Sequence, residues 1–170
     1  YMIYSMRANN TLDANRMEAY LQDTYRFTSK GGHTHFTLNY GVRMSHWSFN
    51  KETIVSPRVS LGIIPAYSEN TTFRFAAGLY YQAPFFKELR DTSTVNGITY
   101  ANLNEKIKSP RSIHFIAGYD YRFRINNLRY RFSAEAYYKA LGNFIPYSVN
   151  NVKVVYYGEN RASGHATGID

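Results

Sequence analysis

The stretch that decides the fold is residues 113–138, IHFIAGYDYRFRINNLRYRFSAEAYY. Every second residue of its first arm is apolar or aromatic, and those between are mostly polar, with Ile116 as the exception. The alternation resumes after a short turn at residues 125–127. Because successive side chains of a strand point to opposite faces, this pattern predicts a hairpin of two long strands with one oily and one polar face. Such ribbons occur in soluble sandwiches and barrels and in membrane barrels.

The same alternation marks further strands along the chain. Clear strands are expected at residues 17–27, 36–44, 55–63 and 73–81, and weaker ones at 152–157 and 162–169. Residues 1–10 alternate loosely and are expected to be the end of a strand whose beginning is missing. Pro57 lacks a backbone donor and should lie near a strand end or a bulge.

Length, charge and cysteine content exclude several classes of protein. The 170 residues make one ordinary domain or a piece of a larger one. No apolar run reaches the roughly 18 residues of a membrane helix, which excludes a helical membrane protein but not a β-barrel. Cysteine is absent, so a disulfide framework and a thiolate metal site are excluded. The net charge is +8, but the basic residues are spread along the chain, and no nucleic-acid partner is expected.

Connections between the expected strands alternate in length. Those near 28–33, 65–70 and 125–127 are short, whereas those near 46–53, 82–110 and 141–151 are longer. An antiparallel up-and-down meander would gather the short turns at one rim and the long loops at the other, as outer-membrane barrels do. The pattern therefore favours an all-β fold that is part of a large transmembrane β-barrel.

Aromatic side chains crowd the strand ends beside the short turns. They are Tyr25, Phe27, Phe73, Phe75, Tyr121, Phe123, Tyr130 and Phe132. This distribution predicts an aromatic girdle at one membrane interface. The alternative is that these rings form the packed core of a soluble sandwich.

In the membrane interpretation, the apolar set faces lipid and the polar set faces the lumen. The residues expected to face the lumen are Arg26, Arg43, Arg58, Arg74, Arg122, Arg131 and Glu135. A soluble sandwich would expose the same charges to water, so the charges alone do not discriminate between the two.

No constellation of residues suggests catalysis, so the chain is not expected to be an enzyme, and no cofactor or metal site is expected. His33 and His35 share one strand face near a turn, where solvated histidines are favoured over a metal pair. The other histidines have no ligand-like spacing.

The long connections are the candidate ligand-binding elements. In residues 82–110 the candidates are Phe85, Phe86, Lys87 and Arg90, which would touch a ligand at the outer mouth of the barrel. In the connection near 141–151 they are Phe144, Tyr147 and Asn150, because aromatic and amide groups suit sugars or chelates. The alternative for both segments is an ordinary solvated loop.

Several segments together resemble a known family. They are SPRVSL at 56–61, FRFAAGLYYQAP at 73–84 followed by Glu88-Leu89, AEAYYK at 134–139, NFIPY at 143–147, and Tyr157-Gly158. In this order and spacing they resemble the barrel of TonB-dependent outer-membrane receptors of the Bacteroidetes type. The resemblance implies a plugged barrel of about 22 strands. Residues 1–170 would supply about seven or eight of them, from its C-terminal half, without the plug domain.

The resemblance also implies a function. The chain would be barrel wall of an outer-membrane active transporter for a scarce solute, such as a ferric siderophore, a haem- or cobalamin-like group, an oligosaccharide or a peptide. Its partners would be the lipid bilayer, and the plug domain and TonB in the full-length protein; a surface lipoprotein is left open. The alternative is a soluble antiparallel β domain that binds a ligand or partner, as a lectin or adhesin module does.

Overall fold

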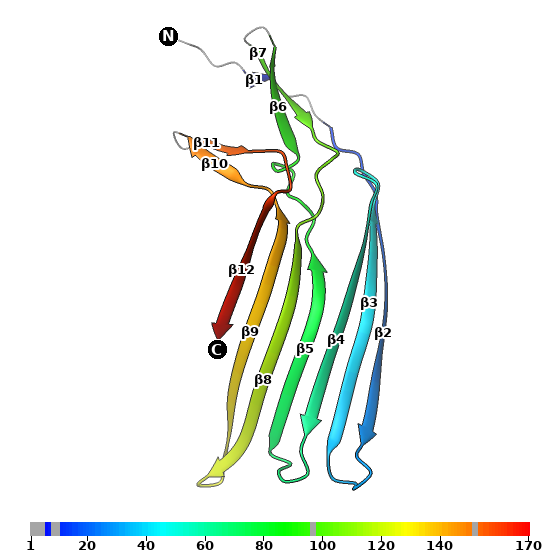
Figure 1. Ribbon diagram of the computed structural model, residues 1–170, viewed down its shortest axis with the longest axis vertical. Coiled ribbons are helices and arrows are strands. Elements are labelled where there is room, and N and C mark those ends of the chain that lie inside the picture. Colours follow the sequence, from blue (N-terminus) through cyan, green and yellow to red (C-terminus); the bar gives the residue numbers. More distant parts are fainter. Residues whose placement is uncertain (1–5, 8–10, 96–97, 151–152) are drawn as a thin grey trace.

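One antiparallel sheet of seven strands, in the order β12-β9-β8-β5-β4-β3-β2, forms the body of the chain. The computed structural model describes residues 6–7, 11–95, 98–150 and 153–170. Figure 1 shows these strands side by side, with the tight turns at one end and the long loops at the other. The predicted up-and-down meander of an all-β fold is therefore confirmed.

Apart from β12, which has the predicted bounds, the strands of this sheet are longer than the alternating segments from which they were predicted. They are β2 (Arg16–Thr28), β3 (His35–Trp47), β4 (Glu52–Ile64), β5 (Thr71–Tyr81), β8 (Arg111–Ile125), β9 (Leu128–Phe144) and β12 (Ala162–Ile169). The longest, β9, has 17 residues and includes positions 141–144, which the sequence pattern assigned to a loop. Tertiary pairing with β8 and β12 extends it past the end of the clear alternation.

Two weakly patterned segments form strands, as predicted, but these strands lie outside the main sheet. Within residues 152–157, β11 (Lys153–Tyr156) pairs with β10 (Tyr147–Asn150) as a separate hairpin. Within residues 1–10, β1 (Met6–Arg7) pairs in parallel with β7 (Ile98–Leu103), and residues 1–5 and 8–10 lie outside the described part. The same small sheet includes β6 (Arg90–Val95). The partner strands β6, β7 and β10 lie in segments expected to be loops, because short ladders without clear alternation are hard to assign from sequence.

Pro57 lies within β4 rather than at a strand end. It is paired with Val42 of β3, but the ladder between β4 and β5 stops at Arg58, one residue away. Proline is thus tolerated where β4 separates from its other neighbour.

The registers place most of the apolar side chains of the meander on one face, with Ile54 and Ile116 among the exceptions. Directly opposed residues such as Leu38 and Leu61, Leu61 and Phe75, and Phe75 and Ala117 share that face across four strands. The polar residues between them share the other face. A shift of one residue in any ladder would exchange the two sets, so the alternating sequence fixes the register.

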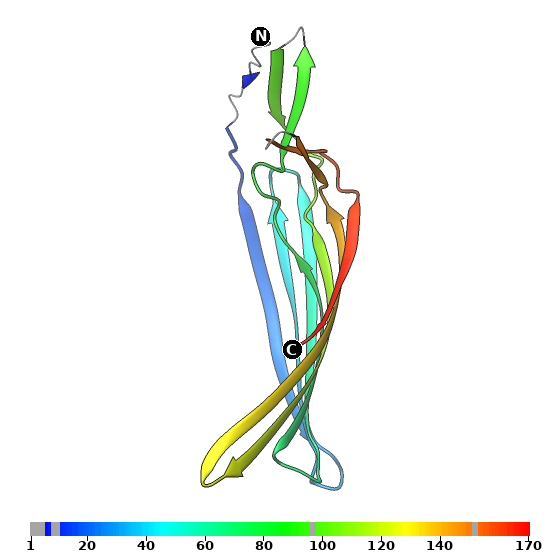
Figure 2. The ribbon, with the colours of Figure 1, turned by 90° about the vertical axis from the view of Figure 1, so that its left-hand side faces the viewer.

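No second layer covers the oily face in the part of the chain that the structure describes. Phe75 is 46% exposed and Phe115 is 53% exposed, and neither Leu38 nor Leu61 is buried. Figure 2 shows the sheet from the side as a single curved layer. The soluble sandwich is therefore not the arrangement adopted, because it would seal these side chains between two sheets.

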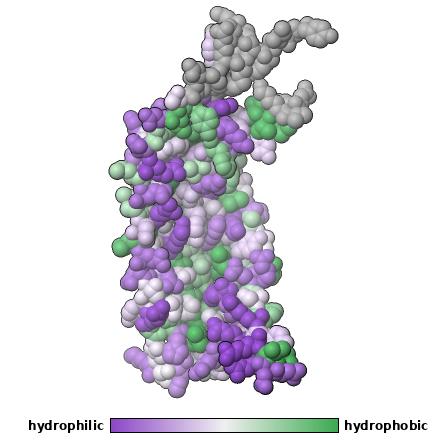
Figure 3. Space-filling model, turned by 180° about the vertical axis from the view of Figure 1, so that it is seen from behind, coloured by the Kyte–Doolittle hydropathy of each residue, from purple (hydrophilic) through white to green (hydrophobic). Residues whose placement is uncertain are grey.

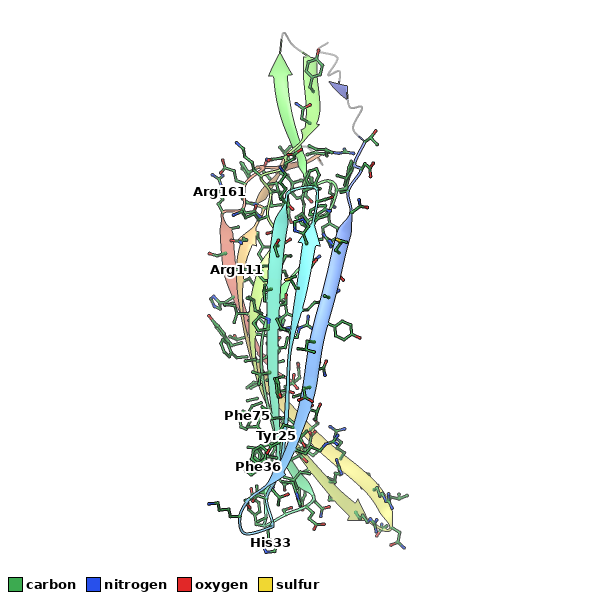
Figure 4. All side chains as sticks on the ribbon, turned by 90° about the vertical axis from the view of Figure 1, so that its right-hand side faces the viewer. Tyr25, His33, Phe36, Phe75, Arg111 and Arg161 are labelled. Atoms are coloured by element: carbon green, nitrogen blue, oxygen red, sulfur yellow. The ribbon has the colours of Figure 1, made fainter. Side chains whose placement is uncertain are left out.

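Aromatic rings on the oily face form a belt near the short turns. Phe27 stacks on Phe36 with ring centroids 4.7 Å apart, and Phe123 lies 5.6 Å from Tyr130. The rings of Phe73 and Tyr119, in the neighbouring strands β5 and β8, are 5.4 Å apart. Figure 4 shows Tyr25, Phe36 and Phe75 near the turn end of the sheet, with His33 on the turn itself.

Among the described residues, no helix has the length and apolarity needed to cross a membrane.

The turn between β8 and β9 is a two-residue hairpin with both residues in the left-handed region. Asn126 has a φ of 49° and Asn127 a φ of 64°. Asparagine tolerates this conformation, and the twist of such a turn matches that of the strands it joins.

We predict that Asn127→Val lowers the free energy of unfolding of the full-length protein by about 1–2 kcal/mol, because a β-branched residue is strained at positive φ. Asn127→Gly should change it by no more than a few tenths of a kcal/mol. Urea unfolding in detergent measures both variants. Equal losses for the two would show that the left-handed turn is not what Asn127 contributes.

Candidate functional site

The long loops fold together into a structure that we call the loop platform, comprising residues 46–53, 82–110 and 143–161. The buried hydrophobic core residues of the described chain are all in it: Trp47, Leu89, Ile107 and Ile145. They come from all three loops, with Leu89 and Ile107 from the same connection, so burying them fixes the loops against one another. No periodic pattern in the sequence marks this cluster.

Glu52 joins two of the loops of the platform. Its carboxylate accepts hydrogen bonds from the backbone N–H of Ser109 at 3.0 and 3.1 Å and from the Ser109 hydroxyl at 2.6 Å. Ser109 is 1% exposed, so its N–H has no access to water. The first residue of β4 thereby holds the end of the 82–110 connection beside the sheet.

Asparagine side chains tie the remaining loop backbones together. Asn50 donates to the carbonyl oxygen of Ile107 at 2.7 Å. Asn160 donates to the carbonyl oxygens of Lys108 at 2.8 Å and Asn143 at 2.7 Å. These bonds give irregular backbone the partners that a ladder would otherwise supply.

The structure brings the predicted ligand residues of the 82–90 segment together on the surface of the platform. Phe85 is 56% exposed and Phe86 is 40% exposed. The Arg90 guanidinium lies 5.1 Å from the centroid of the Phe86 ring, while Lys87 is exposed beside it. The Glu88 carboxylate accepts the Phe85 backbone N–H at 2.8 Å and fixes the turn.

The second predicted group lies on the same platform. Phe144 ends β9 with 40% exposure, and Tyr147 begins β10 with 59% exposure and packs on Tyr156 at 5.8 Å. Asn150 is the last residue of β10. The two groups are linked beneath the surface, because Leu89 and Ile145, next to each group in sequence, belong to one buried cluster.

The registers place all seven residues predicted to face the lumen on one face, which we call the polar wall. Arg26, Arg43, Arg58 and Arg74 follow one another across β2 to β5, and Glu135 lies in register with Arg74 through Gly118. Figure 3 shows a largely hydrophilic surface over the height of the sheet, with hydrophobic groups between.

Charges near the turn end of the polar wall are paired across strands. Asp120, 4% exposed, lies 2.7 Å from Arg74 Nε and 2.7 Å from Arg131 Nη2, and it accepts the Ser133 hydroxyl at 2.7 Å. Arg74 also lies 3.6 Å from Glu135. Gly118 leaves room for the guanidinium, because a Cβ there would lie 3.1 Å from Arg74 Nη2. Farther up the wall, Arg43 pairs with Glu18.

The middle of the polar wall carries basic groups against tyrosine rings. Arg58 lies 4.5 Å from the Tyr80 ring centroid, and the His114 ring lies 4.4 Å from the same ring. Lys139, opposite His114, lies 4.6 Å from the Tyr137 ring. These groups have no carboxylate within ion-pair distance among the described residues. Such a row suits anionic groups that face it.

Within the described residues no cluster of three or more histidine, aspartate or glutamate side chains could hold a metal ion. His35 lies with its Nδ1 3.2 Å from the Thr28 hydroxyl, across the first hairpin.

Comparison with known proteins gives one family. The model described as TonB dependent receptor-like, beta-barrel matches residues 3–170. A search of curated proteins finds no match to the chain.

We predict that Glu52→Ala lowers the local free energy of opening of the 104–110 segment by about 1–3 kcal/mol, because the buried Ser109 N–H loses its acceptor. Hydrogen exchange of the Ser109 amide in the full-length protein measures this. Glu105→Ala, an exposed change in the same loop, is the control. Equal exchange in the two variants would show that Glu52 does not hold the platform.

Proposed function

The chain belongs to the TonB-dependent receptor-like β-barrel family, whose members are outer-membrane transporters, and from this premise we propose how its residues serve uptake of a scarce solute. The chain forms part of the barrel wall. The solute is a ferric siderophore, a haem- or cobalamin-like group, an oligosaccharide or a peptide. TonB and the plug domain of the full-length receptor are its working partners.

The observation that carries this proposal is the single two-faced sheet. In hydrocarbon, backbone polar groups must be paired within the protein, and long ladders meet that demand. Apart from β12, the strands of the meander have 11 to 17 residues, against the roughly 9 to 11 that span a bilayer. β2 and β12 each have one edge without a partner strand among the described residues. Further strands of the full-length receptor would pair with these edges and close the barrel.

The polar wall faces the lumen in this proposal, and the oily face meets acyl chains. Side chains such as Arg26 and Arg122 then point into a water-containing, plugged interior rather than into lipid. The positive charges of Arg58 and Lys139 favour a solute, or a plug surface, that bears carboxylate or phosphate groups.

The loop platform is the outer contact for the solute. Phe86 and Arg90 offer a flat ring with a guanidinium stacked on it, and Tyr147 offers a second exposed ring. Such surfaces bind planar or ring-shaped groups by stacking and hydrogen bonding. A surface lipoprotein that closes over the platform would extend the same contact.

We predict that Val59→Lys destabilises the full-length receptor in lipid by about 2–4 kcal/mol, because Val59 meets lipid near mid-bilayer. Ser60→Lys should cost about 1 kcal/mol, chiefly the hydrogen bond from Asn39 at 3.2 Å. Unfolding from phospholipid vesicles compares the two neighbouring positions. Equal costs, or a larger cost at Ser60, would contradict the proposed facing.

Uptake tests the transport proposal directly. Cells that lack the full-length receptor should lose energy-dependent uptake of at least one labelled solute among ferric siderophores, haem, cobalamin, oligosaccharides and peptides. In cells that carry Phe86→Ala with Arg90→Ala, the apparent KM for that solute should rise about tenfold, the equivalent of about 1.4 kcal/mol of lost binding. Lys106→Ala, exposed on the same platform, is the control. Unchanged uptake of every solute in the deletion strain would contradict transport.

A further inference from the structure

The tip of the β8–β9 hairpin carries four arginines on the polar face. Arg122 lies directly opposite Arg131, and Arg124 directly opposite Arg129. Like charges placed directly opposite across an antiparallel pair repel each other. Strand formation does not require like charges at these positions. The next pair on the same face, Asp120 and Ser133, shows that other residues fit the ladder equally well.

These arginines lie on the part of the hairpin that extends past its pairing with β5. The β5 strand reaches only to Tyr121 of β8, so the hairpin continues past its neighbour. All four arginines are exposed, and with Asn70 of the adjacent turn they line a hollow of about 630 Å³. The end of this hairpin lies at the lower left in Figure 1 and therefore at the lower right in Figure 3, which is seen from behind. Hydrophilic surface gathers at that corner of Figure 3.

Most of this charge has no counterpart in the described chain. Arg131 reaches Asp120 at 2.7 Å, but Arg122, Arg124 and Arg129 have no carboxylate within ion-pair distance among the described residues. The tip is nevertheless well defined, since its left-handed Asn126-Asn127 turn and the stacked rings of Phe123 and Tyr130 fix both strands. The backbone positions from which the arginines extend are therefore fixed before any anion arrives.

The facing of the tip decides which anion fits. The aromatic rings of Phe123 and Tyr130 occupy the opposite face, which is the lipid face in the proposed function, so phospholipid headgroups would meet the rings rather than the arginines. The arginine face is continuous with the polar wall through Asp120 and Arg74. A partner inside the barrel mouth meets it first.

We propose that these four arginines dock an acidic segment of the receptor's own plug domain; this inference rests on the proposed function. Successive arginine pairs lie two residues apart along each strand, a spacing of about 7 Å. An extended segment with carboxylates at alternate positions has the same spacing. Each guanidinium can then bind a carboxylate through two parallel N–H···O bonds.

Site-specific photocrosslinking in the full-length receptor tests the proposal. A photoreactive amino acid replaces Asn70, which lines the hollow without supplying charge, and mass spectrometry of receptor in outer membranes identifies the crosslinked peptide. An acidic plug peptide is the expected product. Arg124→Glu with Arg129→Glu should lower its yield about tenfold, whereas Lys30→Glu, exposed on another short turn, should leave it unchanged.

Crosslinks to phospholipid, to a separate protein or to a plug peptide without carboxylates would overturn this docking surface, as would a yield unaffected by the arginine changes. Crosslinking is read only on receptor that fractionates with the outer membrane. If receptor in the outer membrane lacks the acidic crosslink, the docking surface is wrong, but the proposed function is not affected. If Val59→Lys and Ser60→Lys destabilise the receptor equally, the proposed function itself is wrong.

Discussion

The structure depends on one constraint, which is that seven strands must pair their backbones while keeping most of their apolar side chains on the same side. Period-two sequence and antiparallel register satisfy both demands together. Leu38, Leu61 and Phe75 lie side by side on one face because each ladder is in phase with the next. With no second layer over that face in the described chain, the sheet needs an apolar solvent, and a bilayer is that solvent for an outer-membrane barrel.

The polar wall on the other face carries more basic side chains than acidic ones, so only some of its positive charges can be paired. Near the turn end, the Asp120 carboxylate is shared by Arg74 and Arg131, and Gly118 makes space for the Arg74 guanidinium. At mid-height, tyrosine rings take the place of carboxylates beside Arg58 and Lys139. The polar wall is therefore internally compensated in part and leaves positive charge for whatever fills the barrel.

The two ends of the sheet differ because their connections differ. Short turns need only the local chemistry of residues such as Asn126 and Asn127. The long connections cannot satisfy their backbones locally, so they build a platform around Trp47, Leu89 and Ile107, with Glu52 and Asn160 as ties. The exposed rings that we propose as ligand contacts are thus carried on a packed base rather than on a free loop.

The strands of the polar wall could be predicted from the sequence because alternation over a dozen residues is a strong local signal. The same signal placed Arg26 to Arg131 on one face, since period two leaves no other choice once a strand is assigned. Sequence reasoning missed the β6–β7 hairpin, and it expected a strand at 152–157 but not its partner β10; these ladders of six and four pairs lack clear alternation. It also missed the buried cluster under the platform, because contacts between Trp47, Leu89 and Ile145 have no period. Phe86 and Arg90 were chosen as candidate ligand residues from the composition of their segment, but the stacking of one on the other depends on a turn that Glu88 fixes.

The most direct test of the central claim is solvent contact along one strand. Single cysteines at positions 58 to 62 carry spin labels in a full-length receptor from which any other cysteine has been removed; residues 1–170 contain none. Collision rates with oxygen, which concentrates in lipid, and with a water-soluble nickel chelate are then measured by electron paramagnetic resonance in vesicles. We predict high oxygen contact at positions 59 and 61 and low contact at 58, 60 and 62. Uniform contact along the strand, or the opposite alternation, would contradict a lipid-facing oily surface.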